Sequence, residues 1–164
     1  MEFRWMRNLV ACGAVVIASS ALFGQGSSNC LPVGGMLMTN LGAVDASTTM
    51  GPVTGDLKGA VGVTILGQTV QNGGATLAFT VQHHWVTDSG AMVSFQPATA
   101  TVSQVSANSP LYGVSSYSAQ ITGGTGKFAG ATGNLSFIGE ADLSTGELVF
   151  RYRGTICFAH QPAE

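Results

Sequence analysis

The stretch ITGGTGKFAGATGNLSF, Ile121–Phe137, sets closely spaced glycines and threonines around Phe128. Its segment GTGKFA (124–129) has the form G-x-G-x-x-A of dinucleotide-binding loops, which lead directly into a helix. Here more glycines and then an alternating strand pattern follow instead. A P-loop is excluded as well, because Phe128 stands where that motif has Ser or Thr after Lys127. The stretch therefore predicts a corner between two strands, in which glycine allows positive φ and Phe128 packs into the core.

Alternating hydrophobic patterns on both sides of this corner predict strands rather than helices. The clearest is ATLAFTVQHHWV (75–86), in which every second side chain points to the same face. Its apolar face holds Leu77, Phe79, Val81, His83 and Trp85. ELVFRYRGTICF (147–158) alternates in the same way, and so does LYGVSSYSAQIT (111–122). One face of the segment 111–122 is predicted to hold Leu111, Tyr117 and Ile121.

Weaker patterns complete the expected fold. Further strands are predicted at 57–66, 91–96, 99–106 and 133–142, separated by turn sequences rich in Gly, Asn, Ser and Pro. The segment 30–51 is expected to contain an irregular start and one strand. About eight short strands result, and such a sheet hides its edges as a barrel or as a sandwich. We predict a single all-β domain, an antiparallel eight-stranded barrel.

The first residues have the pattern of a secretory signal peptide. A start with Arg4 and Arg7 precedes the uncharged run Leu9–Phe23, and small residues follow. We predict a signal peptide over 1–26, a barrel domain over 27–164, and a secreted protein, extracellular or periplasmic, with no membrane contact after cleavage. The alternatives are an uncleaved membrane anchor and lipidation at Cys12.

Two cysteines remain in the predicted mature chain, Cys30 near its start and Cys157 near its end. Export to an oxidising compartment favours a disulfide between them. Such a bond brings the first and last strands together, as in a closed barrel. The alternative is two unrelated buried thiols.

The low charge of the chain excludes one class of partner. Charged residues make up 9% of the sequence, and the formal net charge is -2 at pH 7. Basic clusters are absent from the sequence, so nucleic acid is not expected as a partner. A surface that relies on Ser, Thr, Gln and Asn suits an extracellular protein and is compatible with a homo-oligomer.

The residues around the glycine-rich corner resemble a known family. TGGTGKFAGATG (122–133), a strand with Leu135 and Phe137, and FRYRGTI (150–156) resemble the C-terminal half of allene oxide cyclase-like barrels. Dirigent proteins share a similar Gly-Thr-Gly-x-Phe turn. The resemblance covers about 111–157 and extends to secreted bacterial members of this barrel family.

The resemblance implies an eight-stranded barrel with an apolar cavity, often assembled as dimers or trimers. Allene oxide cyclases steer the ring closure of a fatty-acid epoxide, and dirigent proteins hold radical partners in a fixed pose. In both, confinement and orientation supply most of the effect. This sequence has no Glu between Ser27 and Lys127, so a cyclase-type Glu on an early strand is absent.

Four residues are candidates for ligand binding. His83 shares a face with Phe79 and Trp85, which suggests a polar group at the mouth of an apolar pocket, and Tyr117 is expected to line the same pocket. The alternatives are a hydrogen-bonded histidine at a strand end and ordinary core aromatics. His84 points to the face opposite His83, so the two cannot chelate one metal. We expect no metal and no cofactor.

Three functions are compatible with this sequence. The first is a secreted barrel that binds an apolar small molecule. The second is a cyclase or isomerase that steers a reactive apolar substrate, with His83 or Asp56 involved. The third is a structural module of the cell envelope, whose interior would be filled by Phe79, Phe128, Phe137 and Phe150.

Overall fold

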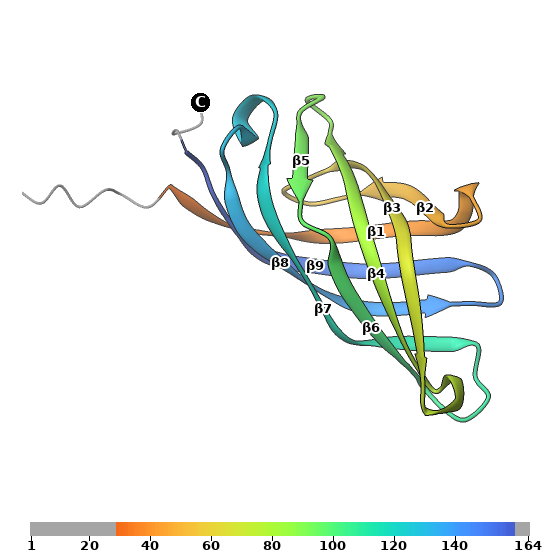
Figure 1. Ribbon diagram of the computed structural model, residues 1–164. Coiled ribbons are helices and arrows are strands. Elements are labelled where there is room, and N and C mark those ends of the chain that lie inside the picture. The colour runs from red at the N-terminus through yellow and green to blue at the C-terminus, as the bar shows by residue number, and fades with distance from the viewer. Residues whose placement is uncertain (1–28, 160–164) are drawn as a thin grey trace, which may run out of the picture.

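The computed structural model describes residues 29–159, in which nine strands form one antiparallel sheet (Figure 1). The predicted signal peptide, 1–26, lies outside these residues. The strands are β1 (Cys30–Asp45), β2 (Thr48–Val53), β3 (Gly59–Gln71), β4 (Thr76–Thr87), β5 (Met92–Phe95), β6 (Ala98–Gln104), β7 (Leu111–Gly124), β8 (Thr132–Asp142) and β9 (Glu147–Cys157). Single 3-10 turns occur at η1 (Asn72–Gly74) and η2 (Gly126–Phe128). Residues 29–159 contain no helix long and apolar enough to cross a membrane.

The sheet closes on itself and has eight positions around the ring. β1 pairs with both β2 and β9, and β3 pairs with β4, so no strand is left at an open edge. β5 and β6 both lie between β4 and β7. They form two parts of one ring position, interrupted at Pro97, which has no backbone N–H to donate to a neighbouring strand. The predicted eight-stranded antiparallel barrel is confirmed, and the sandwich is excluded.

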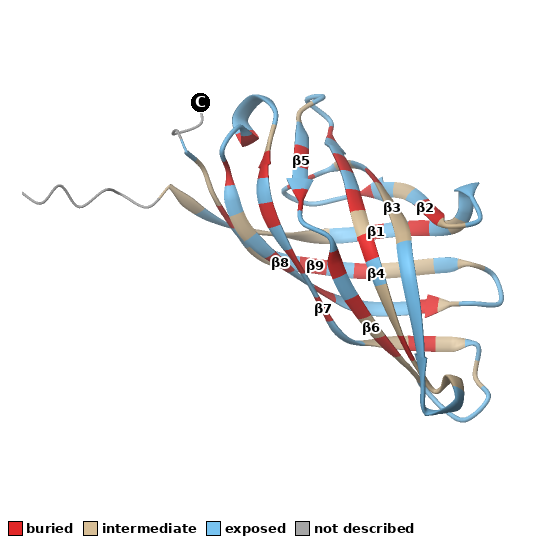
Figure 2. Cartoon of the chain, in the orientation of Figure 1, coloured by how far each residue is buried: buried red, intermediate tan, exposed pale blue. Residues whose placement is uncertain are grey.

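The strand faces agree with the predicted alternation over most of the chain. Buried and exposed residues alternate along β4, β8 and β9 (Figure 2). β7 differs, because its register with β6 skips Ser115: Thr101 pairs with Ser116 and Val102 with Val114. This bulge reverses which face points inward, so Tyr112 is buried in place of the predicted Leu111.

The prediction for 30–51 was wrong. Cys30–Asp45 is a continuous strand of 16 residues, and β2 follows it directly. The glycines that suggested irregular structure serve close strand contact instead. A Cβ atom at Gly51 would lie 1.9 Å from the carbonyl oxygen of Met38, so only glycine fits there.

The glycine-rich stretch forms the predicted corner. η2 leads from β7 into β8, and Phe128 is fully buried within the barrel. Gly126 has a φ of 56°, a conformation that glycine adopts without strain. Beside this corner, Cys30 and Cys157 face each other across β1 and β9 and form the predicted disulfide.

Candidate functional site: an apolar cavity in one half of the barrel

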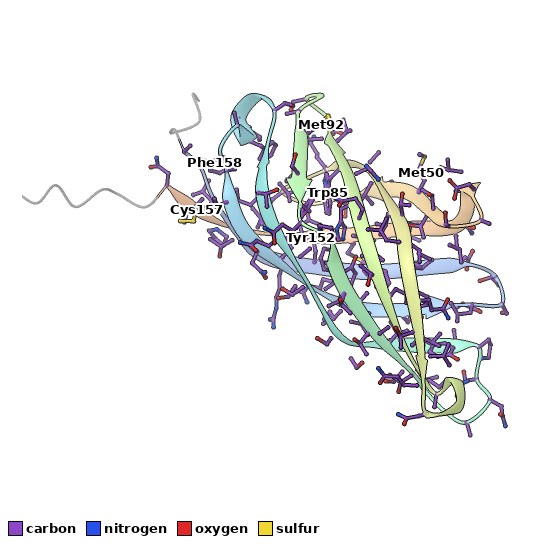
Figure 3. All side chains as sticks on the ribbon, viewed as in Figure 1. Met50, Trp85, Met92, Tyr152, Cys157 and Phe158 are labelled. Carbon is purple, nitrogen blue, oxygen red and sulfur yellow. A yellow bond between two sulfur atoms is a disulfide. The ribbon has the colours of Figure 1, made fainter. Side chains whose placement is uncertain are left out.

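The barrel interior is divided into two halves that differ in packing. At the end with the glycine-rich corner, which we call the plugged half, large side chains fill the space between the strands. Trp85 and Tyr152 lie inside the barrel here (Figure 3) and meet edge to face, with ring centroids 5.3 Å apart. The largest fully buried side chains are Trp85, Tyr152, Phe128, Ile121, Leu135, Ile156, Val61 and Val93. None of them lines the cavity described next.

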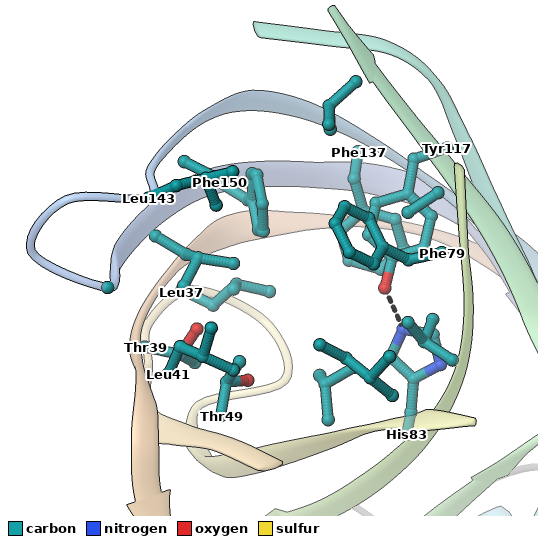
Figure 4. Close-up of a pocket in the computed structure, with 18 residues that line it drawn as sticks. Leu37, Thr39, Leu41, Thr49, Phe79, His83, Tyr117, Phe137, Leu143 and Phe150 are labelled. Atoms are coloured by element: carbon teal, nitrogen blue, oxygen red, sulfur yellow. Dashed lines mark hydrogen bonds between the residues drawn. The ribbon is translucent and has the colours of Figure 1, made fainter. Parts of the chain in front are cut away.

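The other end, which we call the hollow half, contains an apolar cavity of about 80 Å³ (Figure 4). Its wall comes from β1, β2, β3, β4, β6, β7, β8 and β9 and from the β8–β9 hairpin. The lining residues are Leu37, Thr39, Leu41, Thr49, Val63, Ile65, Phe79, Val81, His83, Ala100, Val102, Tyr117, Phe137, Ala141, Leu143, Gly146, Leu148 and Phe150. Leu143 is 40% exposed and marks the rim. No Asp, Glu, Lys or Arg belongs to this lining.

The cavity exists because short side chains occupy inward positions in this half. Ala100 and Ala141 lie among the aromatic residues of the cavity wall, and Gly146 lies in the β8–β9 hairpin beside it. A void of this kind is unfavourable for folding, since protein interiors otherwise pack as densely as organic crystals. The hollow half therefore gives up packing energy that the plugged half retains.

His83 and Tyr117 form the main polar feature of the cavity wall. The Nε2 atom of His83 lies 2.6 Å from the hydroxyl of Tyr117, and both residues are buried. Phe137 stacks on Tyr117, with ring centroids 4.4 Å apart. Burial, with a smaller contribution from His84, lowers the pKa of His83 to about 4. Burial also raises the pKa of Tyr117, so both groups are uncharged at neutral pH.

The His83–Tyr117 pair has two polar hydrogens, and the hydrogen bond between the two side chains uses only one of them. A neutral imidazole carries one N–H and the phenol carries one O–H, and only one of these two hydrogens can lie between Nε2 and the hydroxyl oxygen. If Tyr117 donates, the N–H is at Nδ1 of His83, which has no partner among residues 29–159. If His83 donates, the Tyr117 hydrogen is free instead. Either tautomer leaves one donor unused.

A second unpartnered polar atom belongs to the opposite wall. Thr49 lies on β2, between Leu41 of β1 and Val63 of β3. Its side chain is 4% exposed, and its Oγ1 atom has no hydrogen-bond partner in the described part of the chain. Thr39 and Thr49 lie across the cavity from His83 (Figure 4). Sequence analysis missed both threonines, although Leu37, Thr39 and Leu41 alternate as a strand would require.

Three of the four predicted ligand-binding residues line the cavity, namely Phe79, His83 and Tyr117. Trp85 does not. It lies in the plugged half, where its indole N–H donates to the carbonyl oxygen of Leu57 at 2.9 Å, and it has no exposed surface. Its predicted place beside the pocket is therefore corrected, while ligand binding by the other three stays a prediction.

The structure brings no metal-binding cluster together within residues 29–159, where no group of three or more His, Cys, Asp or Glu side chains is suitably placed. His84 lies on the outer face of β4, and its Nε2 atom is 3.3 Å from the hydroxyl of Thr64. Asp56 also lies outside the cavity and accepts a hydrogen bond from the Gly34 N–H at 2.7 Å.

Comparisons with known proteins give one likeness in fold. No family model matches the chain, and no curated protein matches it. A solved structure of a pterocarpan synthase dirigent protein is similar, with a TM-score of 0.47 and 15% sequence identity over 87% of this chain and 96% of that one. Dirigent proteins are one of the two groups that the sequence resembles. Neither family membership nor function follows from a likeness of this size.

Proposed function

We propose that this protein binds a small apolar molecule in the hollow half of its barrel. The supporting observation is a carbon-lined cavity kept open beside a half that is fully packed. Binding sites for small molecules are typically concave and apolar, with a few polar groups that orient the ligand. Purely apolar cavities in proteins stay dry and take up molecules such as benzene.

The packing of the phenylalanines argues against a purely structural module. That hypothesis expects Phe79, Phe128, Phe137 and Phe150 to fill the barrel together. Phe128 does fill the plugged half, whereas the other three form the wall of the cavity and leave its centre open. The space is therefore available to a ligand.

The cyclase or isomerase alternative has less support. Acid or base catalysis of such a reaction needs a group that accepts or donates a proton near neutral pH. His83 is held neutral with a pKa of about 4, and burial raises the pKa of Tyr117. Asp56 does not line the cavity. Steering of a reactive substrate by shape alone stays compatible with the site.

Secretion and self-association are part of the same proposal. The Cys30–Cys157 disulfide fits an oxidising compartment. Apolar side chains also follow one another in register across the outer surface, where exposed patches often mark contacts between proteins. This outer band consists of Val149, Met38, Pro52, Ala60, Val86 and Met92. Met38→Glu is expected to convert an assembled form to monomers in analytical ultracentrifugation, and an unchanged molecular mass would exclude the band as the contact.

Titration with ethylbenzene tests the proposed cavity binding. We expect chemical-shift changes in nuclear magnetic resonance spectra to concentrate on the lining residues. Ala100→Phe fills the cavity and is expected to abolish these changes. The matched variant Ala129→Phe adds the same side chain at an exposed position of the glycine-rich corner, outside the outer band, and should bind as the wild type does. Failure of the wild type to bind ethylbenzene or any similar apolar probe would refute the proposal.

A further inference from the structure

We propose that the cavity selects uncharged ligands that carry a hydrogen-bond-accepting oxygen, and that the His83–Tyr117 pair and Thr49 bind the polar groups of such a ligand. This inference rests on the proposed function and specifies its ligand class. The two halves of the barrel differ in how completely their buried polar groups are hydrogen-bonded.

The plugged half leaves no buried side-chain donor without a partner. The Tyr152 hydroxyl donates to the carbonyl oxygen of Thr54 at 3.0 Å and accepts the N–H of Leu57 at 3.0 Å. The Trp85 indole donates to Leu57 as well. Among residues 29–159 the only buried side-chain nitrogen or oxygen atoms without a hydrogen-bond partner are Oγ1 of Thr49 and Nδ1 of His83. Both residues line the cavity.

Buried polar groups in native proteins are almost always hydrogen-bonded, so exceptions that gather at one site call for an explanation there. The His83–Tyr117 pair offers one donor in either tautomer, which matches a carbonyl, ether or hydroxyl oxygen. Thr49 offers a hydroxyl that both donates and accepts. Both atoms are buried, so a ligand oxygen meets them after rotation of the imidazole or of the threonine side chain into the cavity.

Charge decides which oxygen-containing molecules enter. The cavity wall has no Lys or Arg side chain, and His83 is neutral. Arg151 and Arg153 are exposed on the outer face of β9 and cannot reach inward. A carboxylate in this wall would lose its hydration without gaining a cation, which is strongly unfavourable. Ketones, alcohols, ethers and esters carry the required oxygen without that penalty.

Three probes of similar size separate these effects: ethylbenzene, acetophenone and benzoate, each titrated calorimetrically into the full mature chain at pH 7. One added hydrogen bond is expected to make acetophenone bind about tenfold more tightly than ethylbenzene. Benzoate, which has nearly the shape of acetophenone but carries a charge, is expected to show no binding in the same concentration range.

Variants of His83 and Tyr117 test whether the pair supplies the free hydrogen-bond donor. His83→Phe leaves the Tyr117 hydroxyl free to donate, and Tyr117→Phe leaves the imidazole N–H, so each single variant retains part of the preference for acetophenone. The double variant His83→Phe/Tyr117→Phe removes both donors of the pair and is expected to retain only the part of the acetophenone preference that Thr49 supplies. Because it replaces both partners by apolar groups of similar shape, it should still fold.

Thr49→Val keeps the side-chain shape and provides a second test that leaves the pair intact. It is expected to reduce the acetophenone preference, whereas Thr80→Val on the exposed outer face of β4 should not. An unchanged preference in the double variant, or equal binding of benzoate, would overturn this inference while the cavity still binds ethylbenzene. Absence of binding for all three probes would overturn the proposed function itself.

Discussion

The two halves of this barrel are built from the same strands but follow different rules of packing. In the plugged half, Trp85, Phe128 and Tyr152 fill the interior. Backbone carbonyl groups accept the hydrogen bonds of the Trp85 indole and of the Tyr152 hydroxyl. In the hollow half, alanine and threonine lie among the aromatic residues of the cavity wall, and two buried polar atoms have no partner within residues 29–159. The comparison teaches that one end of a small barrel can supply stability while the other end contains a cavity.

The boundary between the halves is narrow. His83 and Trp85 are separated by one residue on β4 and point to the same face, about 7 Å apart along the strand. Yet Trp85 is sealed in the plug while His83 lines the cavity. A division of this kind makes the halves separable by mutation.

Truncation of the plug should have the largest effect. We expect Phe128→Ala to lower the free energy of unfolding by about 3–5 kcal/mol, because it opens a cavity where packing is complete. Phe79→Ala in the hollow half should cost about half as much, since Phe79 is only partly buried and already borders a cavity. Urea unfolding of both variants measures the difference. Equal losses would show that the cavity wall is as tightly packed as the plug.

Loss of the disulfide should come next. The double variant Cys30→Ala/Cys157→Ala removes a link between residues 127 positions apart, and we expect it to lower the free energy of unfolding by about 2–5 kcal/mol. The bond lies beside the plug, so ethylbenzene binding in the hollow half should persist. Unfolding with and without dithiothreitol provides the control, because the reductant should destabilise the wild type and leave the double variant unchanged. Loss of ligand binding in the folded variant would show that the halves are coupled.

Which residues of a regular strand share a face was predictable from sequence, because a period of two separates the two faces. It identified the apolar faces of β4 and β9 and placed Phe79 and His83 together. The disulfide was predictable because only Cys30 and Cys157 remain in the predicted mature chain and an oxidising compartment favours their pairing. The glycine-rich corner was predictable because a motif that needs a helix was followed by a strand pattern.

The position of each residue along the barrel axis was not predictable in the same way. It depends on register between strands, and register shifts at bulges that leave no clear pattern. The pairing of β3 with β4 skips Leu66, just as the pairing of β6 with β7 skips Ser115. Trp85 was therefore placed on the correct face but in the wrong half. Thr49 was missed for a different reason, since the segment 30–51 was expected to contain an irregular start and only one strand.

Acidification should weaken the barrel through His83. Its pKa is about 4 in the folded protein and about 6.5 when exposed in the unfolded chain. Below pH 6.5 the unfolded chain binds a proton that the folded protein does not, so the free energy of unfolding falls with pH until about pH 4. The difference corresponds to about 3 kcal/mol. Urea unfolding between pH 7 and pH 4 measures this loss.

His83→Gln is the matched control for this pH dependence. It removes the titrating group while keeping a side chain that can bond to Tyr117, so the loss between pH 6.5 and pH 4 should become much smaller. His84 is exposed and remains in the variant. A loss of the same size in His83→Gln would assign the pH dependence to other groups.

The smallest effect is also the most specific, because it has opposite signs at two neighbouring residues. Thr49→Val removes a buried hydroxyl that has no partner, and we expect the free energy of unfolding to rise by about 1 kcal/mol. Thr48→Val should lower it by about 1 kcal/mol, because the Thr48 hydroxyl donates to Asp45 at 3.1 Å and lies 3.3 Å from the Thr64 hydroxyl. Thermal unfolding of the two variants compares them directly.

A bound ligand should remove the stability gain that is expected for Thr49→Val. With acetophenone in the cavity, the Thr49 hydroxyl has a partner in the wild type and none can form in Thr49→Val. The variant should then lose its advantage, so that the free protein is more stable with valine and the bound protein is not. An advantage that persists at saturating acetophenone would mean that the Thr49 hydroxyl takes no part in binding. The unpartnered hydroxyl would then be a defect in packing rather than part of the site.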